Sequence, residues 1–275
     1  MSNFHLAGVI PVSAPNLDFN MPWHDSLMPI GKNYLAIERS VLECAYAGCG
    51  TIWLVCDDSI EPLVRKRIGD YVQDPIWINR KYEKFKNNFR KRIPVYYVPS
   101  SVHDRGNKDS LGWSALHGCY MARKSTKSIS RKLCPDMYYI CFPYGVYDIK
   151  KLTNHRRDLS STSSWSLTSD GKTILDGEYL GLSISWQQVS KLRRSVLDDI
   201  RSQSSERLKN KSFARNFSLK KIYGELELKT LVDVGEYHRI DNWVGYCDYL
   251  GSGSSLMQPP NPILLRGYKS KNLNY

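Results

Sequence analysis

The sequence predicts an α/β protein with a mostly parallel central sheet and helices on both faces. Two observations support this fold class. Short apolar, β-rich runs alternate with amphipathic helical stretches between residues 6 and 142, and such alternation is typical of a parallel sheet with right-handed crossovers. The run Thr51–Cys56 is continuously apolar, as expected of a strand that is buried on both faces.

Each element of this first part follows from its own pattern. After the first strand, a stretch rich in Pro, Asn and Asp predicts a long loop up to Pro29. Apolar residues at helical spacing from Ile37 onward predict a helix that ends at Gly48-Cys49-Gly50. In chain order we expect strands at 6–12, 51–56, 93–98 and 138–142, and helices at 33–48, 60–72 and 112–123.

The pattern after residue 150 is mixed, and we interpret the whole chain, 1–275, as a single domain. Two strands, at 165–168 and 179–185, are expected around the turn Ser169-Asp170-Gly171-Lys172, followed by a helix at 187–201. Residues 202–214 are polar and without period, which predicts an exposed loop. The proline-bearing stretch from Gln258 is expected to wrap the surface.

The composition limits the functional classes. Hydrophobic residues make up 41% and charged residues 24% of the chain, which argues against disorder and membrane bundles. No apolar run approaches the roughly 18 residues of a membrane span, and the start lacks a secretory pattern, so we expect a cytoplasmic protein without membrane contact. The net charge of +12 favours an anionic partner. The seven cysteines form no CxxC pair and mostly lie in apolar runs, which predicts buried free thiols.

The candidate site follows from the sheet. Ligands of parallel sheets bind beyond the carboxyl ends of the strands, which here are the loops that start near Ser13, Asp57, Pro99 and Pro143. Asp57 and its neighbour either hold a metal or ribose hydroxyls, or they cap the following helix. His24, beside an aspartate and a serine, is either part of a proton relay or a source of hydrogen bonds that structure the loop.

Several segments resemble one enzyme family. Three of them, in order, are Gly8-Val9-Ile10-Pro11-Val12, Leu27-Met28-Pro29-Ile30-Gly31-Lys32 and Ala47-Gly48-Cys49-Gly50-Thr51-Ile52-Trp53-Leu54-Val55. Together they resemble the opening of the sugar-phosphate nucleotidyltransferases, which have a GT-A-like Rossmann architecture. Residues 111–116, 176–181 and 236–246 resemble later segments of that family.

The resemblance implies a reaction and the residues for it. It implies transfer of a nucleoside monophosphate from a nucleoside triphosphate to a sugar 1-phosphate, with Mg²⁺ as cofactor, a nucleotide-binding half at 6–150 and a sugar-phosphate half at 151–275. The implied catalytic positions are Asp25 and Lys32, and the acids nearest to the metal positions are Asp148 and Asp241. The implied nucleotide-binding residues are Val12, Ser13, Ala14, Leu111, Gly112 and Ser114, and the sugar-binding residues are Tyr144, Gly177, Glu178 and Tyr179.

Departures from the family pattern keep a second interpretation open. No glycine occurs between Gly8 and Gly31, and Pro15 supplies no N–H group to a phosphate. Asp25 stands where the family has a phosphate-neutralising lysine, and Arg239 aligns with a metal-binding aspartate. The alternative is therefore a catalytically degenerate nucleotide- or sugar-binding protein on the same fold, and we predict that sugar-nucleotide synthesis is weak or absent.

A third interpretation comes from the segment 80–92. Aromatic residues at spacings of three and four predict an amphipathic helix there. Its basic residues either face solvent or contact a polyanion, which would make this a nucleic-acid-associated protein. These basic residues are Arg80, Lys81, Lys84, Lys86, Arg90, Lys91 and Arg92.

Overall fold

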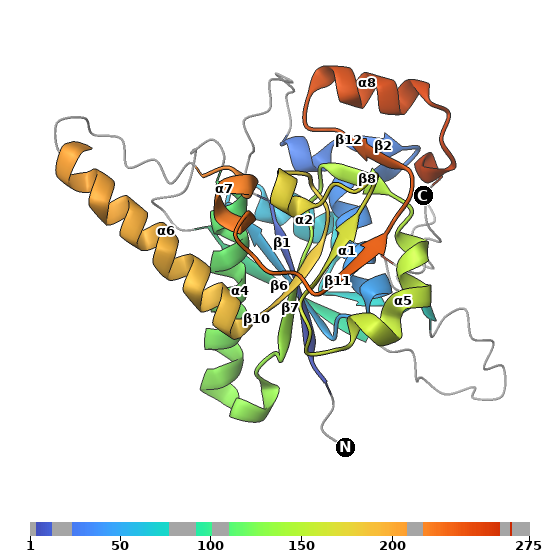
Figure 1. The fold of residues 1–275 in the computed structure, drawn as a ribbon. Coiled ribbons are helices and arrows are strands. Elements are labelled where there is room, and N and C mark those ends of the chain that lie inside the picture. Colours follow the sequence, from blue (N-terminus) through green and yellow to red (C-terminus); the bar gives the residue numbers. More distant parts are fainter. Residues whose placement is uncertain are drawn as a thin grey trace, which may run out of the picture.

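A computed structural model describes residues 4–12, 24–76, 92–100, 110–207, 217–258 and 265. Its centre is an eight-stranded sheet in the order β11-β9-β10-β7-β1-β4-β6-β5 (Figure 1). The four strands β7, β1, β4 and β6 are mutually parallel, as the sequence predicts. β10 is antiparallel to β7 and to β9, β11 is parallel to β9, and β5 is antiparallel to β6. The strands are β1 (Leu6–Pro11), β4 (Thr51–Cys56), β5 (Tyr71–Gln73), β6 (Arg92–Pro99), β7 (Met137–Ile140), β9 (Trp165–Thr168), β10 (Leu182–Ser185) and β11 (Thr230–Asp233).

Helices cover both faces of this sheet. A Cβ added at Gly8 would lie 2.6 Å from Cys44 Sγ on α1, whereas one added at Gly118 on α4 would lie 2.6 Å from Val9 Cγ1. Because Gly8 and Val9 are successive strand residues, they point to opposite faces, so α1 and α4 pack on opposite sides. The helices are α1 (Ala36–Ala47), α2 (Glu61–Ile68), α4 (Leu111–Ile129), α5 (Leu152–Leu159), α6 (Trp186–Arg207), α7 (Leu219–Tyr223) and α8 (Trp243–Gly251). None of the described helices has the length and apolar character that a membrane span requires.

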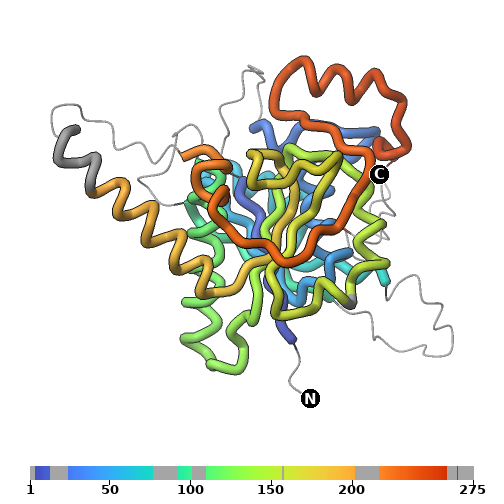
Figure 2. Tube along the Cα trace, viewed as in Figure 1, coloured from blue at the N-terminus to red at the C-terminus, as the bar shows by residue number. Residues whose placement is uncertain are grey.

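Two small ribbons lie outside the central sheet. One is the hairpin of β2 (Pro29–Gly31) and β3 (Tyr34–Leu35), and the other pairs β8 (Gly145–Tyr147) with β12 (Tyr237–Arg239). The late helix α8 lies over the early hairpin, as the red and blue segments of Figure 2 show. The contact is made by Tyr249, whose hydroxyl donates to the Ile30 carbonyl over 2.8 Å, and by Tyr246, which bonds the Pro29 carbonyl.

A buried charged group joins α1 to β7 and β8. Arg39 Nη2 lies 2.8 Å from Glu43 Oε2, and its guanidinium lies 4.2 Å from the ring centre of Tyr147. The hydroxyls of Tyr147 and Tyr139 both donate to Glu43 Oε1. All four side chains are essentially inaccessible to solvent. Because burial disfavours the phenolates, it raises the pKa of Tyr139 and Tyr147 well above their ordinary value.

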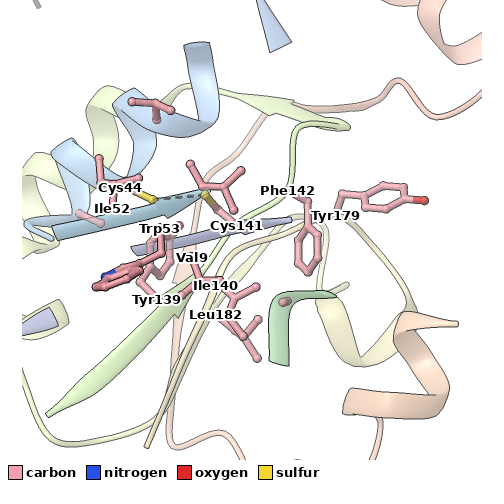
Figure 3. Close-up of a cluster of buried hydrophobic side chains, with 14 of the residues drawn as sticks. Val9, Cys44, Ile52, Trp53, Tyr139, Ile140, Cys141, Phe142, Tyr179 and Leu182 are labelled. Carbon is pink, nitrogen blue, oxygen red and sulfur yellow. Dashed lines mark hydrogen bonds between the residues drawn. The ribbon is translucent and has the colours of Figure 1, made fainter. Parts of the chain in front are cut away.

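The cysteines follow the sequence prediction with two exceptions, because Cys134 is only partly buried and Cys247 is exposed. All seven are free, and five are buried. Cys44 Sγ and Cys141 Sγ lie 3.5 Å apart between α1 and the end of β7 (Figure 3). Cys247 is exposed on α8, so the prediction of a buried thiol is wrong there.

Several predicted boundaries are wrong. α2 ends at Ile68 instead of residue 72, because Gly69 has a φ of +85° and the chain turns into β5, where Val72 is buried. α6 continues through Arg207, so residues 202–207 are helical and not a loop. α4 extends beyond its predicted end at residue 123, and β7 and β10 are shorter than the predicted runs. Residues 208–214, and those from 259 except Leu265, lie outside the described residues.

Candidate functional site

The carboxyl ends of the four parallel strands meet at one edge of the sheet. Backbone hydrogen bonds continue the register past the strand ends, from Val12 N to Val55 O over 2.7 Å, from Ser100 N to Cys56 O over 3.0 Å and from Cys141 N to Val9 O over 3.1 Å. The segments that leave β1, β4, β6 and β7 therefore begin side by side. This edge is where a ligand of a parallel sheet binds, and we take it as the candidate site.

The N-terminus of α4 contributes unsatisfied polar groups to this edge. Ser110 precedes the helix, but its hydroxyl does not cap it. The Oγ atoms of Ser110 and of Ser100, which follows β6, are both buried and have no hydrogen-bond partner. The first N–H groups of a helix lack partners within the helix and form its positive end. An orphaned hydroxyl at such an end, as Ser110 has, suits an anionic ligand.

The predicted nucleotide-binding residues on α4 are held by α7. Leu111, Gly112 and Ser114 are buried in the first turns of the helix. A Cβ at Gly112 would lie 2.6 Å from Ile222 Cδ1, and the Tyr223 hydroxyl donates to the Gly112 carbonyl over 3.1 Å. Contact with α7 therefore fixes the start of α4. Ser13 and Ala14, predicted for the same subsite, lie outside the described residues, whereas Val12 is buried at the end of β1.

His24 and Asp25 approach the edge from the segment before β2. His24 Nδ1 accepts from Ser26 N over 3.2 Å and lies 2.8 Å from Ser26 Oγ. Of the two roles considered from the sequence, these contacts correspond to hydrogen bonds that structure the loop. Burial lowers the pKa of His24, and the charge of Asp57 opposes that change. Burial also raises the pKa of Asp25. A partly desolvated carboxylate thus lies at the place where the resemblance puts a lysine.

Three aromatic rings, those of Phe142, Tyr144 and Tyr179, pack together after β7. The ring centre of Tyr179 lies 6.0 Å from that of Phe142, and both rings are drawn in Figure 3. The Tyr179 ring centre also lies 5.6 Å from that of Tyr144. Tyr144 is fully buried, and its hydroxyl has no hydrogen-bond partner. Burial, followed by the charge of Asp25, raises the pKa of Tyr144 well above its ordinary value. The Tyr144 hydroxyl therefore remains neutral.

Arg239 links the predicted sugar-binding residues to Asp241. Its Nη2 lies 2.5 Å from Asp241 Oδ2, its Nη1 lies 3.5 Å from Glu178 Oε2, and its guanidinium lies 5.0 Å from the Tyr179 ring centre. The Tyr237 hydroxyl donates to Glu178 Oε2 and accepts from Tyr179 N, both over 3.1 Å. Gly177, with a φ of +95°, turns the chain into this cluster. We name Glu178, Tyr179, Tyr237, Arg239 and Asp241 the arginine cluster.

The two acids proposed as metal ligands lie far apart. β8 and β12 pair Tyr147 with Tyr237 and Gly145 with Arg239, so Asp148 and Asp241 follow opposite ends of the ribbon. Their separation is five register positions, or roughly 16 Å at 3.3 Å per residue. β12 ends at Arg239, which places Asp241 beyond the strand on which it was expected. Asp148 Oδ1 accepts from Lys150 N over 3.0 Å and caps a short helix, η4 (Ile149–Lys151).

The donor set does not fit one Mg²⁺ ion. The Asp241 carboxylate is held by Arg239 and also accepts from Asn242 Nδ2 over 3.0 Å. Within the described ranges, no three His, Cys, Asp or Glu side chains gather closely enough to hold a metal ion. Mg²⁺ requires octahedral oxygen ligands, which Asp148 and Asp241 do not supply together at one point.

Other predicted residues lie away from the edge. Lys32 is exposed in the turn of the β2–β3 hairpin, beside Asn33, whose carbonyl accepts from Arg67 over 2.8 Å. Arg92 begins β6 and lies over the Tyr71 ring at 4.5 Å, which is at the amino end of that strand. Residues 80–91, with the other basic positions, lie outside the described residues.

Sequence reasoning missed Ser100, Ser110, Tyr237 and the role of Arg239. The serines carry a weak signal, since each adjoins an expected strand end or helix start. Tyr237 and Arg239 carry none, because their contacts depend on how the β8–β12 ribbon is placed.

Comparison with known proteins identifies the fold. No protein-family model and no curated protein matches the sequence, but solved structures do. A chain from Bacillus anthracis assigned as a glucose-1-phosphate thymidylyltransferase, in complex with sucrose, matches with a TM-score of 0.55 and 10% identity, over 93% of this chain and 96% of that one. A UDP-glucose pyrophosphorylase with bound UDP-glucose matches with a TM-score of 0.51 and 12% identity, over 90% and 98%. The UTP-bound enzyme from Acinetobacter baumannii matches with a TM-score of 0.51 and 14% identity, over 93% and 95%. This chain therefore has the fold of the sugar-phosphate nucleotidyltransferases.

Proposed function

We propose that the protein binds a nucleoside triphosphate and a sugar phosphate at the carboxyl edge of its sheet, as a nucleotidyltransferase-like protein. The observation that carries the proposal is a pair of buried hydroxyls without a described partner, that of Ser110 directly before α4 and that of Ser100 directly after β6. A buried polar atom without a partner costs free energy, and a bound phosphate or base would relieve that cost. Solved structures of this fold carry UTP and UDP-glucose, which supports the class of ligand.

Each part of the edge has a role in this proposal. Ser110 and the start of α4 bind the nucleotide, with Ser100 after β6. The ring of Tyr179, supported by the buried Tyr144, covers an apolar face of the sugar, and Glu178, oriented by Tyr237 and Arg239, accepts a sugar hydroxyl. In the reaction, a phosphate oxygen of the sugar phosphate would attack the α-phosphorus, and pyrophosphate would leave with the electrons of the broken P–O bond.

We further propose that turnover is slow. A phosphoryl transfer enzyme works by positioning and by stabilising negative charge. In the described part of the edge, Asp25 adds a carboxylate, Lys32 lies in an exposed turn elsewhere, and Arg239 is already paired with two carboxylates. Binding is therefore better supported than catalysis.

The binding test compares two serines. Ser110→Ala and Ser183→Ala each remove a buried hydroxyl that has no partner, so neither should lower the thermal midpoint of the free protein. Only Ser110→Ala should weaken nucleotide binding, by about 10- to 100-fold if a charge-assisted hydrogen bond of roughly 1.5–3 kcal/mol is lost. Thermal shift with UTP, dTTP, ATP, GTP and CTP identifies the base, and titration calorimetry gives the affinity. Equal affinity in the two variants would contradict the assignment.

Catalysis is measured separately, by pyrophosphate release from each NTP with glucose 1-phosphate and Mg²⁺. We expect release well below ~1 per second, the lower end of common enzyme turnover. Glu178→Gln should weaken binding of the sugar phosphate, whereas the exposed control Glu227→Gln should not. Turnover at or above that rate would refute the proposal of slow transfer and leave the binding proposal intact.

A further inference from the structure

We propose that the outer face of α4 and α6 is a second binding surface, and that it binds single-stranded nucleic acid. This surface is separate from the strand-end site and does not depend on the proposed function. α6 lies outside α4 on one side of the sheet (Figure 1). We name it the α4–α6 face, and its residues are Tyr120, Arg123, Lys124, Lys127, Trp186, Lys191, Arg193, Arg194 and Arg201.

Charge is the first observation. α4 and the first four turns of α6, residues 186–201, contain seven Lys or Arg and two Asp. Both aspartates are paired, Asp198 with Arg201 over 3.3 Å and Asp199 with Lys221 over 3.5 Å. Within the described residues, no carboxylate pairs with Lys124, Lys127, Lys191 or Arg194. These four cations therefore give the face positive charge that no described carboxylate offsets, which favours a polyanion.

Aromatic rings set between these cations are the second observation. The Arg123 guanidinium lies 4.6 Å from the Trp186 ring centre, and Arg193 lies 4.3 Å from that of Tyr120. Trp186 and Tyr120 are half-buried, so each residue keeps part of its surface exposed. Unstacked bases bind to aromatic rings and to guanidinium planes. A duplex keeps the flat faces of its bases stacked inside the helix, where an aromatic ring cannot reach them, so this combination fits a single strand.

Shape is the third observation. Two adjoining open grooves of about 460 and 430 Å³ run along α6. Both are lined by Trp186, Ser190, Arg194 and Asp198, and the second also reaches Tyr120 and Arg201. From Trp186 to Arg201 the helix rises roughly 22 Å at 1.5 Å per residue. Trp186, Arg194 and Arg201, which all line the second groove, therefore follow one side of α6, as an extended strand requires.

The binding test uses the full chain and fluorescein-labelled 20-nucleotide strands of mixed sequence. Fluorescence anisotropy is measured with single-stranded RNA, single-stranded DNA and the matching duplex between 50 and 200 mM KCl. We expect single-stranded RNA and single-stranded DNA both to bind more tightly than the duplex. A comparison of the RNA with the DNA shows whether the protein distinguishes ribose from deoxyribose. A DNA strand of the same length without bases keeps the phosphates but removes stacking, and should bind more weakly.

Variants locate the binding to this face. Lys191→Gln with Arg194→Gln removes two phosphate contacts, so the slope of log K against log salt should fall by about 1.4, at 0.7 per contact, with a loss of about 25-fold in affinity at 0.1 M salt. Lys150→Gln with Lys172→Gln removes the same charge from exposed positions elsewhere and should have little effect. Thermal midpoints check that both double variants are folded.

Three results would overturn the proposal. The first is an equal loss of affinity in both double variants, which would show that only net charge matters. The second is binding of the duplex or of the base-free strand as tight as that of the single strands, which would remove the stacking argument. The third is competition by UTP, which would place the nucleic acid in the strand-end site.

Discussion

At the scale of single residues, Glu43 is the group on which the buried charge depends. It is the counter-ion of Arg39 and the acceptor for Tyr139 and Tyr147. Glu43→Gln keeps the shape but leaves the Arg39 charge uncompensated, and removing one partner of a buried ion pair costs about 3–5 kcal/mol. We expect a loss of that size in the free energy of urea unfolding.

The control is an ion pair at the surface. Glu61 lies 3.1 Å from Arg65, whose side chain is 53% exposed, and such pairs contribute about 1 kcal/mol or less. Glu61→Gln should therefore be nearly neutral. The double variant Arg39→Met with Glu43→Leu removes both charges and should be more stable than Glu43→Gln alone. A Glu43→Gln protein as stable as the Glu61→Gln protein would contradict the assignment.

Whereas the Glu43 charge stabilises the folded protein, the Asp25 charge should destabilise it. Because burial raises its pKa in the folded protein above 3.8, the folded state holds more protons than the unfolded state between the two pKa values. Stability is therefore lost as the pH rises through that window, and the loss persists at pH 7. Asp25→Asn replaces the carboxyl group by an amide that carries no charge at any of these pH values. The urea midpoint of this variant at pH 7 should therefore exceed that of the wild type.

The difference should shrink as the pH falls towards 4, which urea unfolding across this range would follow. The exposed Asp248→Asn is the matched control and should show no such trend. An Asp25→Asn protein that is less stable than the wild type at pH 7 would show that the carboxylate forms a stabilising contact.

At the scale of elements, the close packing of α4 on the sheet leaves no room for a side chain at Gly118. Alanine would favour the helix by about 1 kcal/mol, but its Cβ would lie 2.6 Å from both Val9 Cγ1 and Val55 Cγ2. Overpacking costs about 1–3 kcal/mol, and two β-branched neighbours cannot both move away. We expect Gly118→Ala to lower the thermal midpoint.

Gly251→Ala is the control, because nothing lies within 4 Å of a Cβ at that helical position. It should be neutral or slightly stabilising. A stabilised Gly118→Ala protein would mean that α4 shifts away from the sheet more easily than this packing indicates.

The helices and strands also show how much of the fold could be predicted from the sequence. Strands that are buried on both faces must be apolar throughout, so β4 and its parallel neighbours can be recognised in the sequence as short apolar runs. The three-residue strand β5 was missed, because Val72 continues the helical spacing of α2. The arginine cluster shows a different limit. The family resemblance predicts Glu178 and Tyr179 as site residues. A similarity between sequence segments cannot show the β8–β12 register, which places Asp148 far from Asp241. It also cannot show that Arg239 forms an ion pair with Asp241.

At the scale of the whole molecule, the sheet order predicts a gradient of local stability. β1 has paired strands on both sides and helices on both faces, whereas β5 and β11 are edges, and Leu231 on β11 is 55% exposed. Amide exchange is slowest where opening requires global unfolding. Hydrogen exchange followed by mass spectrometry should find β1 the slowest and β11 and β5 the fastest. Equal protection of β1 and β11 would contradict this.

The order of the strands along the chain also has a consequence for synthesis on the ribosome. The parallel core β7-β1-β4-β6 is complete once residue 140 has emerged, but β10, which covers the outer edge of β7, ends at residue 185. At translation rates of 5–20 residues per second, that edge stays unpaired for roughly 2–9 s. An open strand edge is a template for pairing with another chain. The nascent protein is therefore most exposed to aggregation in this interval, and a chaperone that binds extended segments would act on it then.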